Sequence, residues 1–256
     1  MRKGIVSLGF DDGRIDNYYC VKELLKERNM PATFNIVTGY VDRTVSNHPH
    51  EYINKEQLIE LYNNPLFEIA NHSDSHSNDA DDIIKGHKKL VEWLNLPKDI
   101  QLGFATPNCE MEDKYVSDNE NQLREMGICY VRCGHKNSGS KLMWKANLKV
   151  ARLTGAKEFF ESSFEESIIA NPKGLCIYSI PVMNDFRLEQ ITYFLDRVAK
   201  SKGWVNLVFH SIEKDTPQKK LWSWDLEKFK GLLQYLSVAI ETGKLDVMTT
   251  KDAFNS

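Results

Sequence analysis

Short apolar runs alternate with longer amphipathic segments along almost the whole chain. Runs rich in Val, Ile, Leu and Phe predict buried strands, and apolar residues spaced three or four apart predict helices. Strands are expected at 4–10, 32–37, 67–70, 101–104, 128–132, 148–153, 175–180, 205–209 and 245–248. Helices are expected at 15–28, 55–62, 79–94, 114–126, 157–169, 188–200 and 225–240.

Strands separated by helices of this length predict right-handed crossovers and a parallel sheet. The units follow one another without a repeat, a low-complexity tract or a block of charge. We therefore expect one α/β domain over residues 1–256, built as a closed or nearly closed barrel. The least regular segments, 38–53 and 134–145, are expected to shape a binding cleft.

Composition places the chain among globular proteins and narrows its partners. Of 256 residues, 41% are hydrophobic and 27% charged, and the net charge is −3 with a pI near 6.2. This balance gives no electrostatic case for nucleic acid or for an anionic membrane. No apolar run is long enough to span a membrane.

The cysteines and the first residues indicate the compartment. Five scattered cysteines, an odd number, argue against a disulfide framework and for a reducing environment. The chain enters its first strand without a secretory apolar region. A cytoplasmic protein is expected, unless a signal peptide has been removed.

Candidate chemistry begins at the end of the first strand, where Asp11, Asp12 and Gly13 follow an apolar run. The carboxyl ends of parallel strands are where α/β proteins place their active sites. The alternative is structural: Asp-Gly is common in turns, and Asp12 could cap the helix that follows.

A second candidate follows the third strand as His72-Ser73-Asp74-Ser75-His76. Two imidazoles and a carboxylate form a facial set of zinc-type ligands that leaves positions for water and substrate. Two surface histidines in a polar loop are the alternative. Combined with the aspartate pair, one aspartate would complete the metal site and its neighbour would remain as a base.

A third candidate, His210, ends the strand at 205–209. A histidine that is merely part of the core or its rim is the alternative. A metal-dependent hydrolase, however, also needs an acid to protonate its leaving group.

Four segments together resemble the motifs of the NodB-type polysaccharide deacetylases, carbohydrate esterase family four. They are Phe10-Asp11-Asp12-Gly13, His72-Ser73-x-x-His76, Phe104-Ala105-Thr106-Pro107 and the Leu-x-x-His that ends at His210. The resemblance covers nearly the whole chain. It implies a distorted (β/α)7-type barrel, the NodB homology domain, with a divalent metal in a groove at the strand ends.

The resemblance also implies a role for individual residues. Asp12, His72 and His76 would ligate the metal, most commonly zinc, with cobalt, nickel and manganese as further options. Asp11 would be the general base and His210 the general acid. The backbone N–H of Asn108 would help to bind the oxyanion.

The chain departs from the family pattern at three points. Ala105 stands where an arginine often pairs with the catalytic base, and Asn108 and Cys109 replace the usual Tyr-Gly. We hypothesise that Arg132, at the end of the strand at 128–132, supplies the missing charge to Asp11; an exposed strand-end arginine is the alternative. The acidic motif that orients the catalytic histidine is not present in its usual form, and Asp185 is the best local candidate for this role.

These observations predict a metal-dependent hydrolase that removes an acetyl or similar acyl group from an N-acetylated amino sugar of a glycan or glycoconjugate. A non-sugar amide hydrolase or deformylase on the same fold, and a carbohydrate-binding relative without turnover, are the alternatives. Four aromatic residues are candidates to stack on sugar rings or to complete the core: Tyr40, Tyr52, Trp222 and Trp224.

Overall fold

A parallel sheet forms the centre of the molecule. The computed structural model describes residues 3–42, 52–136, 139–172, 174–214 and 221–256. The sheet runs in the order β6-β5-β4-β3-β2-β1-β8-β7, and β11 also pairs with β1. Its strands are β1 (Gly4–Phe10), β2 (Ala32–Ile36), β3 (Phe67–Asn71), β4 (Leu102–Ala105), β5 (Ile128–Arg132), β6 (Cys176–Ile177), β7 (Ile180–Pro181), β8 (Trp204–Phe209) and β11 (Leu245–Val247).

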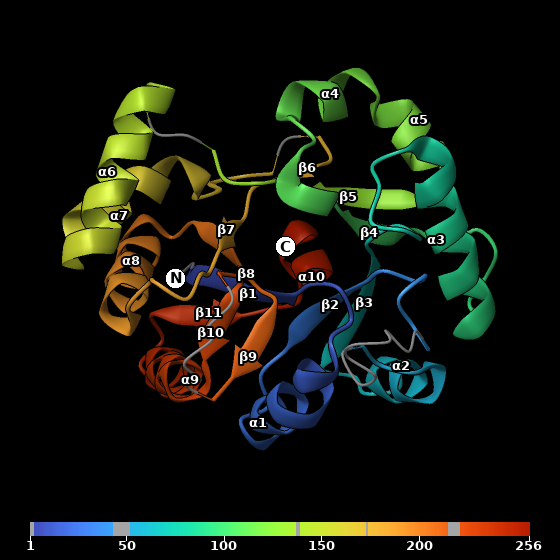
Figure 1. Cartoon of the computed structure of the whole chain (residues 1–256), viewed down its shortest axis with the longest axis horizontal. Coiled ribbons are helices and arrows are strands. Elements are labelled where there is room, and N and C mark those ends of the chain that lie inside the picture. The colour runs from blue at the N-terminus through green and yellow to red at the C-terminus, as the bar shows by residue number, and fades with distance from the viewer. Residues whose placement is uncertain (1–2, 43–51, 137–138, 173, 215–220) are drawn as a thin grey trace.

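Helices surround this curled sheet, which forms a half-barrel: all of them cover its convex side except the last, which lies inside the curl (Figure 1). They are α1 (Lys22–Glu27), α2 (Lys55–Tyr62), α3 (Ala80–Trp93), α4 (Asp113–Asp118), α5 (Glu120–Glu125), α6 (Lys141–Thr154), α7 (Lys157–Phe164), α8 (Leu188–Ser201), α9 (Leu226–Glu241) and α10 (Thr250–Phe254). The α/β architecture expected for a NodB-type barrel is confirmed. No helix among the described residues combines the length and the apolar character that a membrane crossing requires.

Local sequence signals account for several of these boundaries. Asn54 caps α2 as predicted, because its side chain accepts a hydrogen bond from the Gln57 N–H while the Gln57 side chain accepts one from the Asn54 N–H. The predicted helix over 15–28 contains a π-helical turn, Asn17–Val21, before α1. Asn119 divides the predicted helix over 114–126 into α4 and α5.

The strand predicted at 148–153 is wrong, because these residues lie inside α6. Leu148 and Val150 alternate with polar positions, as in a strand, but Leu148 and Ala151 are spaced three apart and are both buried on one face of the helix. Packing of this face against the neighbouring helices makes the segment helical. Residues 141–145, expected to be irregular together with 134–140, form the first part of α6. The helical hairpin of α6 and α7 is therefore inserted between β5 and β6.

The strand predicted at 175–180 is interrupted, and this interruption opens the barrel. Cys176 and Ile177 pair with β5, whereas Ile180 and Pro181 pair with β8. Between them the Ser179 N–H donates to the Gly134 carbonyl instead of to a strand. Within the described residues β6 and β7 are not paired with each other, so the barrel is not closed there.

Three elements were not predicted: β9 (Ser211–Glu213), β10 (Ser223–Asp225) and α10. β9 and β10 form a separate parallel pair beyond β8. Most of the segment at 38–53, expected to shape a cleft, lies outside the described residues.

Aromatic rings form the floor beneath the carboxyl ends of the central strands. The ring of Phe10 packs against those of Phe34, Phe209 and Phe229, with centroid distances of 5.4, 5.5 and 5.9 Å. Trp224 packs on Phe209 and is 1% exposed, so it belongs to this core and is no candidate for stacking on a sugar. The residues that follow Phe10 and Phe209 are consequently fixed on a rigid base.

Candidate active site

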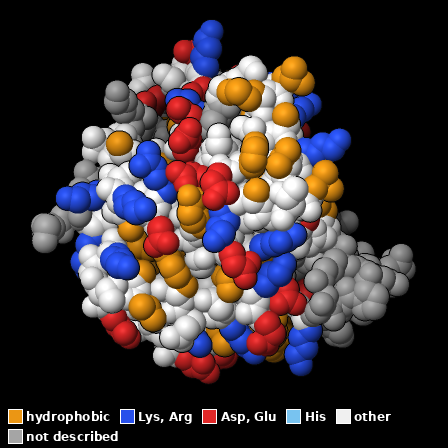
Figure 2. Space-filling view, turned by 90° about the vertical axis from the view of Figure 1, so that its left-hand side faces the viewer, with side chains coloured by type: hydrophobic (Ala, Val, Ile, Leu, Met, Phe, Trp, Pro, Cys, Tyr) orange, Lys and Arg blue, Asp and Glu red, His pale blue; other side chains and the backbone are white. Residues whose placement is uncertain are grey.

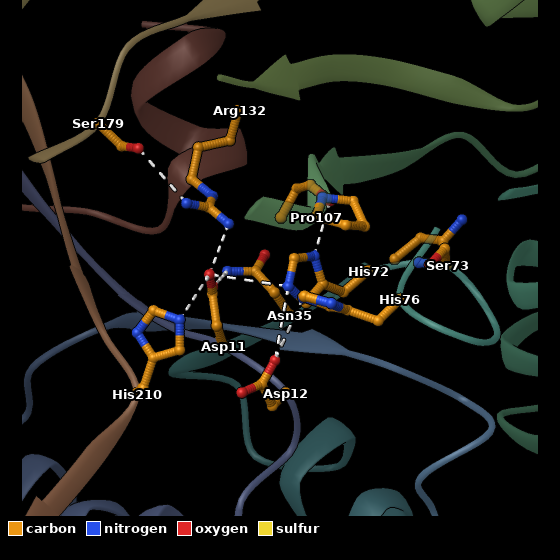
Figure 3. Close-up of polar contacts among 12 residues, drawn as sticks. Asp11, Asp12, Asn35, His72, Ser73, His76, Pro107, Arg132, Ser179 and His210 are labelled. Carbon is orange, nitrogen blue, oxygen red and sulfur yellow. Dashed lines mark hydrogen bonds and ion pairs between the residues drawn. The ribbon is translucent and has the colours of Figure 1, made fainter. Parts of the chain in front are cut away.

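Strand register brings the predicted residues to one edge of the sheet. Phe10 of β1 lies between Phe34 of β2 and Phe209 of β8. The next residue in β1, Asp11, donates its N–H to the Phe209 carbonyl at 2.9 Å, which places it beside His210. Asp11, Asp12, His72, His76, Arg132 and His210 lie around one centre in Figure 3.

Asp12, His72 and His76 converge as a set of potential metal ligands. The Asp12 Oδ1 atom lies 3.7 Å from Nε2 of His72 and 3.8 Å from Nε2 of His76, and the three donors lie within 4.8 Å of one another. Two donors on one zinc ion, each at about 2.1 Å, are at most about 4.2 Å apart. Both measured separations from Asp12 are below this limit, so Asp12 can share one divalent ion with either histidine.

Electrostatics on this side of the site also favour a cation. Burial raises the pKa of Asp12, and the neighbouring Asp11 carboxylate raises it further, although His210 partly offsets both. Burial lowers the pKa of His72 to about 3 and lowers that of His76. Both imidazoles are therefore neutral at physiological pH, the form that ligates metals.

Backbone contacts fix the two histidines. Nδ1 of His72 lies 2.7 Å from the Ala105 carbonyl, so this nitrogen carries the proton and Nε2 is directed at Asp12. The loop to His76 is held by Asp82, whose carboxylate accepts hydrogen bonds from the N–H and Oγ of Ser75. Asp12, Ser73 and His76 have φ angles of 73°, 66° and 65°, in the left-handed region.

Asp11 lies beside the ligand set but is held by other residues. Its Oδ2 accepts a hydrogen bond from Arg132 Nη2 and its Oδ1 one from Asn35 Nδ2, both at 2.7 Å. Burial raises the pKa of Asp11, but the Arg132 guanidinium, the two nearby histidines and Asn35 together lower it to about 2. The carboxylate is thus ionised at every ordinary working pH.

The contact expected between Arg132 and Asp11 is present. Arg132 ends β5, is 1% exposed, and also donates from Nη1 to Ser179 Oγ at 3.4 Å. It supplies the positive charge that Ala105 cannot. Asn35, by contrast, was not identified from the sequence; its position in β2, directly beside the end of β1, was the available signal.

His210 faces Asp11 from the opposite side of the site. Its Nε2 lies 4.0 Å from Asp11 Oδ2, its side chain is 21% exposed, and the Trp222 ring packs against it at 5.1 Å. Nδ1 of His210 has no hydrogen-bond partner among the described residues. Asn17, also not anticipated, donates to the His210 carbonyl and so fixes the backbone only.

The structure does not bring Asp185 to His210. The Asp185 carboxylate instead lies 3.2 Å from Arg152 Nε, in an ion pair at the surface between α6 and the loop after β7. Asp185 lies four residues beyond Pro181, the last residue of the short strand β7. The chain between them can therefore turn away from the site.

Asn108 lies on the turn that follows β4. Its φ of 54° and ψ of 10° interrupt the short helical turn Pro107–Cys109. The Cys109 N–H donates to Thr106 and the Glu110 N–H to Pro107. Among the described residues no hydrogen bond engages the N–H of Asn108.

A groove of about 460 Å³ has Asn108 in its lining. Its walls come from the turn after β4, the residues after β5, and the start of α6. Lys141 and Trp144 of α6 and Tyr178 also line it.

Comparison with known proteins agrees with this geometry. Residues 1–126 match the family described as polysaccharide deacetylase. A search among curated proteins found no match.

Solved structures share the fold at low sequence identity. The Bc1960 peptidoglycan N-acetylglucosamine deacetylase is 18% identical, with a TM-score of 0.52 over 99% of this chain and 89% of that one. The T48 deacetylase is 13% identical, with a TM-score of 0.51 over 99% and 92%. IcaB from Ammonifex degensii is 24% identical with a TM-score of 0.41, and the match covers 49% of this chain and only 57% of that one.

The family match spans Asp11 and the three candidate ligands Asp12, His72 and His76. At these identities the structural likeness establishes the fold alone. Over its first 126 residues, the chain is thus similar to the family described as polysaccharide deacetylase.

Proposed function

We propose that the chain is a metal-dependent hydrolase that removes an acetyl or similar acyl group from an N-acetylated amino sugar of a glycan or glycoconjugate. One observation carries this proposal: Asp12, His72 and His76 converge as ligands while Asp11, next to them, is held apart by Arg132 and Asn35. Two adjacent aspartates thus have two different environments. Residues 1–256 would act as one catalytic domain.

Asp12, His72 and His76 would hold a divalent ion, zinc first among the candidates. Such an ion, when bound, supplies a Lewis acid that polarises the acyl carbonyl and lowers the pKa of water to about 7. The fixed tautomer of His72 and the low pKa of both imidazoles keep the ligand nitrogens unprotonated.

Asp11 would accept the proton of the attacking water. Its two oxygens are oriented by Arg132 and Asn35, which leaves Oδ2 facing both His72 and His210. Because its pKa is about 2, this carboxylate does not retain a proton. His210, 4.0 Å from Oδ2 and outside the ligand set, is the group that would deliver a proton to the leaving nitrogen.

The N–H of Asn108 would stabilise the oxyanion. Backbone donors aimed at the developing negative charge contribute strongly in a site that excludes water. The left-handed backbone at Asn108 separates this N–H from the carbonyls of its own turn.

An acetate-release assay tests the proposal. Chito-oligosaccharides and a small acetylated ester are incubated with protein stripped of metal, with and without added zinc or cobalt. We expect release that depends on the metal. Binding to the sugar without metal-dependent release from any substrate would overturn the enzymatic function.

A further inference from the structure

The net charge of −3 conceals a strongly basic segment. Between residues 126 and 157 there is no Asp or Glu, while seven residues are basic: Arg132, Lys136, Lys141, Lys145, Lys149, Arg152 and Lys157. This segment contains the end of β5, α6 and the start of α7. The basic charge is therefore concentrated on α6, whereas α7 carries Glu158 and Glu161.

The lysines of α6 are exposed and uncompensated. Lys141, Lys145 and Lys149 are spaced four apart, so they lie on successive turns of one side of the helix. None of the three has an ion-pair partner in the part of the chain that the structure describes. Arg152, in contrast, is paired with Asp185.

Large apolar side chains lie among these lysines. Leu142 is 80% exposed, Leu153 72% and Met143 52%, and Phe159 of α7 is 42% exposed. Leu142 and Leu153 are eleven residues apart, which returns them to the same side of a helix after three turns. We call this surface, formed by Leu142, Met143, Lys145, Lys149 and Leu153, the outer face of α6.

The outer face of α6 faces away from the core. Leu148 and Ala151, on the inner side, are buried, so packing within the protein does not require the exposed apolar residues. α6 lies at the edge of the molecule in Figure 1. In Figure 2, on the side that carries α6 to α8, apolar side chains gather in the upper part with Lys and Arg beside them.

Apolar residues interleaved with unpaired lysines match one kind of partner. An anionic lipid surface attracts the lysines and accepts apolar side chains at the boundary of headgroups and acyl chains. A soluble polyanion would use the lysines alone. We propose that the outer face of α6 docks the protein on an anionic lipid surface.

Docking in this way would also orient the groove. Lys141 and Trp144 belong both to α6 and to the lining of the groove that contains Asn108. A lipid surface on α6 would thus lie next to the part of the groove that Lys141 and Trp144 line.

Vesicle sedimentation tests the proposal independently of catalysis. The protein is mixed with phosphatidylcholine vesicles that contain 30 mol% phosphatidylglycerol, or none. We expect binding to the anionic vesicles only, and its loss at 1 M salt, where the Debye length is about 3 Å. Equal sedimentation with both vesicles, or with neither, would overturn the proposal.

Charge variants locate the contact. Lys145→Glu with Lys149→Glu should lower partitioning to anionic vesicles by about tenfold or more, since each lysine near such a surface contributes on the order of 1 kcal/mol. Lys88→Glu with Lys244→Glu changes the net charge equally at exposed sites away from α6 and should have little effect. An equal loss in both double variants would contradict a contact at α6.

Apolar variants separate a lipid from a polyanion. Leu142→Ser with Leu153→Ser should weaken vesicle binding severalfold, whereas Val238→Ser, a change at an exposed residue of α9, should not. Unchanged binding of the leucine variant would assign the face to a soluble polyanion and overturn the lipid proposal. Circular dichroism and zinc binding, expected to equal those of the unmodified protein, establish that each variant is folded.

Discussion

Two imidazoles approach the same carboxylate oxygen from opposite sides, and their surroundings differ. His72 Nε2 lies 3.8 Å and His210 Nε2 4.0 Å from Asp11 Oδ2 (Figure 3). His72 is 1% exposed and its other nitrogen is hydrogen-bonded to Ala105. His210 is partly exposed, and its Nδ1 has no partner among the residues described.

This difference suits the two histidines to different roles. A ligand histidine benefits from a fixed tautomer and a permanently neutral ring. A histidine that exchanges protons benefits from access to solvent and from freedom to change its protonation state. The β1 to β3 side of the site is therefore suited to hold an ion, and the β8 side to move a proton.

Asp11→Asn should have the largest effect on turnover, because it changes the carboxylate that both imidazoles face. Turnover should fall by a factor on the order of 10⁴, while zinc remains bound by Asp12, His72 and His76. Steady-state kinetics and metal analysis of the same preparation measure both quantities. A variant that loses its zinc would show that Asp11 is a ligand and that the proposed division of roles is wrong.

Arg132→Met should destabilise the fold by about 3–5 kcal/mol at pH 7, because it leaves the Asp11 carboxylate buried without its cation. In the unmodified protein the folded-state pKa of about 2 lies below the unfolded value of 3.8, so the stabilisation by Asp11 is present above pH 4 and is lost between pH 4 and 2. In the variant, burial raises that pKa, so the deficit should shrink on acidification.

Urea unfolding at pH 7 and pH 4 measures this deficit. Arg152→Met, which breaks a partly exposed pair, is the matched control and should cost no more than about 1 kcal/mol. A deficit in Arg132→Met that does not depend on pH would show that lost packing, and not the Asp11 charge, causes it.

His72→Ala and His210→Ala test the two sides directly through metal affinity. The first should weaken zinc binding by more than about 100-fold, since loss of a mere outer partner of a ligand already costs roughly 10- to 100-fold. The second should leave zinc affinity unchanged and lower turnover. Calorimetric titration with zinc distinguishes them, and similar losses in both variants would abolish the distinction.

Trp222→Ala gives the smallest expected effect. The Trp222 ring packs on His210, and aromatic contacts of this kind contribute about 0.5–1.5 kcal/mol, which corresponds to a roughly two- to tenfold lower turnover. Trp222→Phe should restore most of it. An unchanged rate in the alanine variant would mean that the ring does not position His210.

The positions of four site residues at strand ends could be predicted from the sequence. Asp11, Asp12, His72 and Arg132 each follow or end an apolar strand, and parallel strands bring such positions to one edge. The Arg132 contact follows from the same rule, because Ala105 of β4 pairs with Arg132 of β5. Local pattern was sufficient for these four residues, whereas Asn35, near the end of β2, was not predicted.

The remaining errors arise where tertiary packing decides between two compatible patterns. Residues 148–153 fit the spacing of both a strand and a helix, and contacts of α6 with α7 select the helix. Asp185 was chosen by proximity in sequence to a strand, but Arg152, on an element that was itself predicted wrongly, binds it instead.

The left-handed backbone at Asp12 and His76 bears on how such sites change over evolutionary time. A residue other than glycine at such a φ angle costs on the order of 1 kcal/mol or more. Selection for folding alone would favour glycine there, whereas selection for a bound ion retains the side chain. Among related chains, glycine at the positions of both Asp12 and His76 would identify proteins that no longer bind the metal, even where the fold is unchanged.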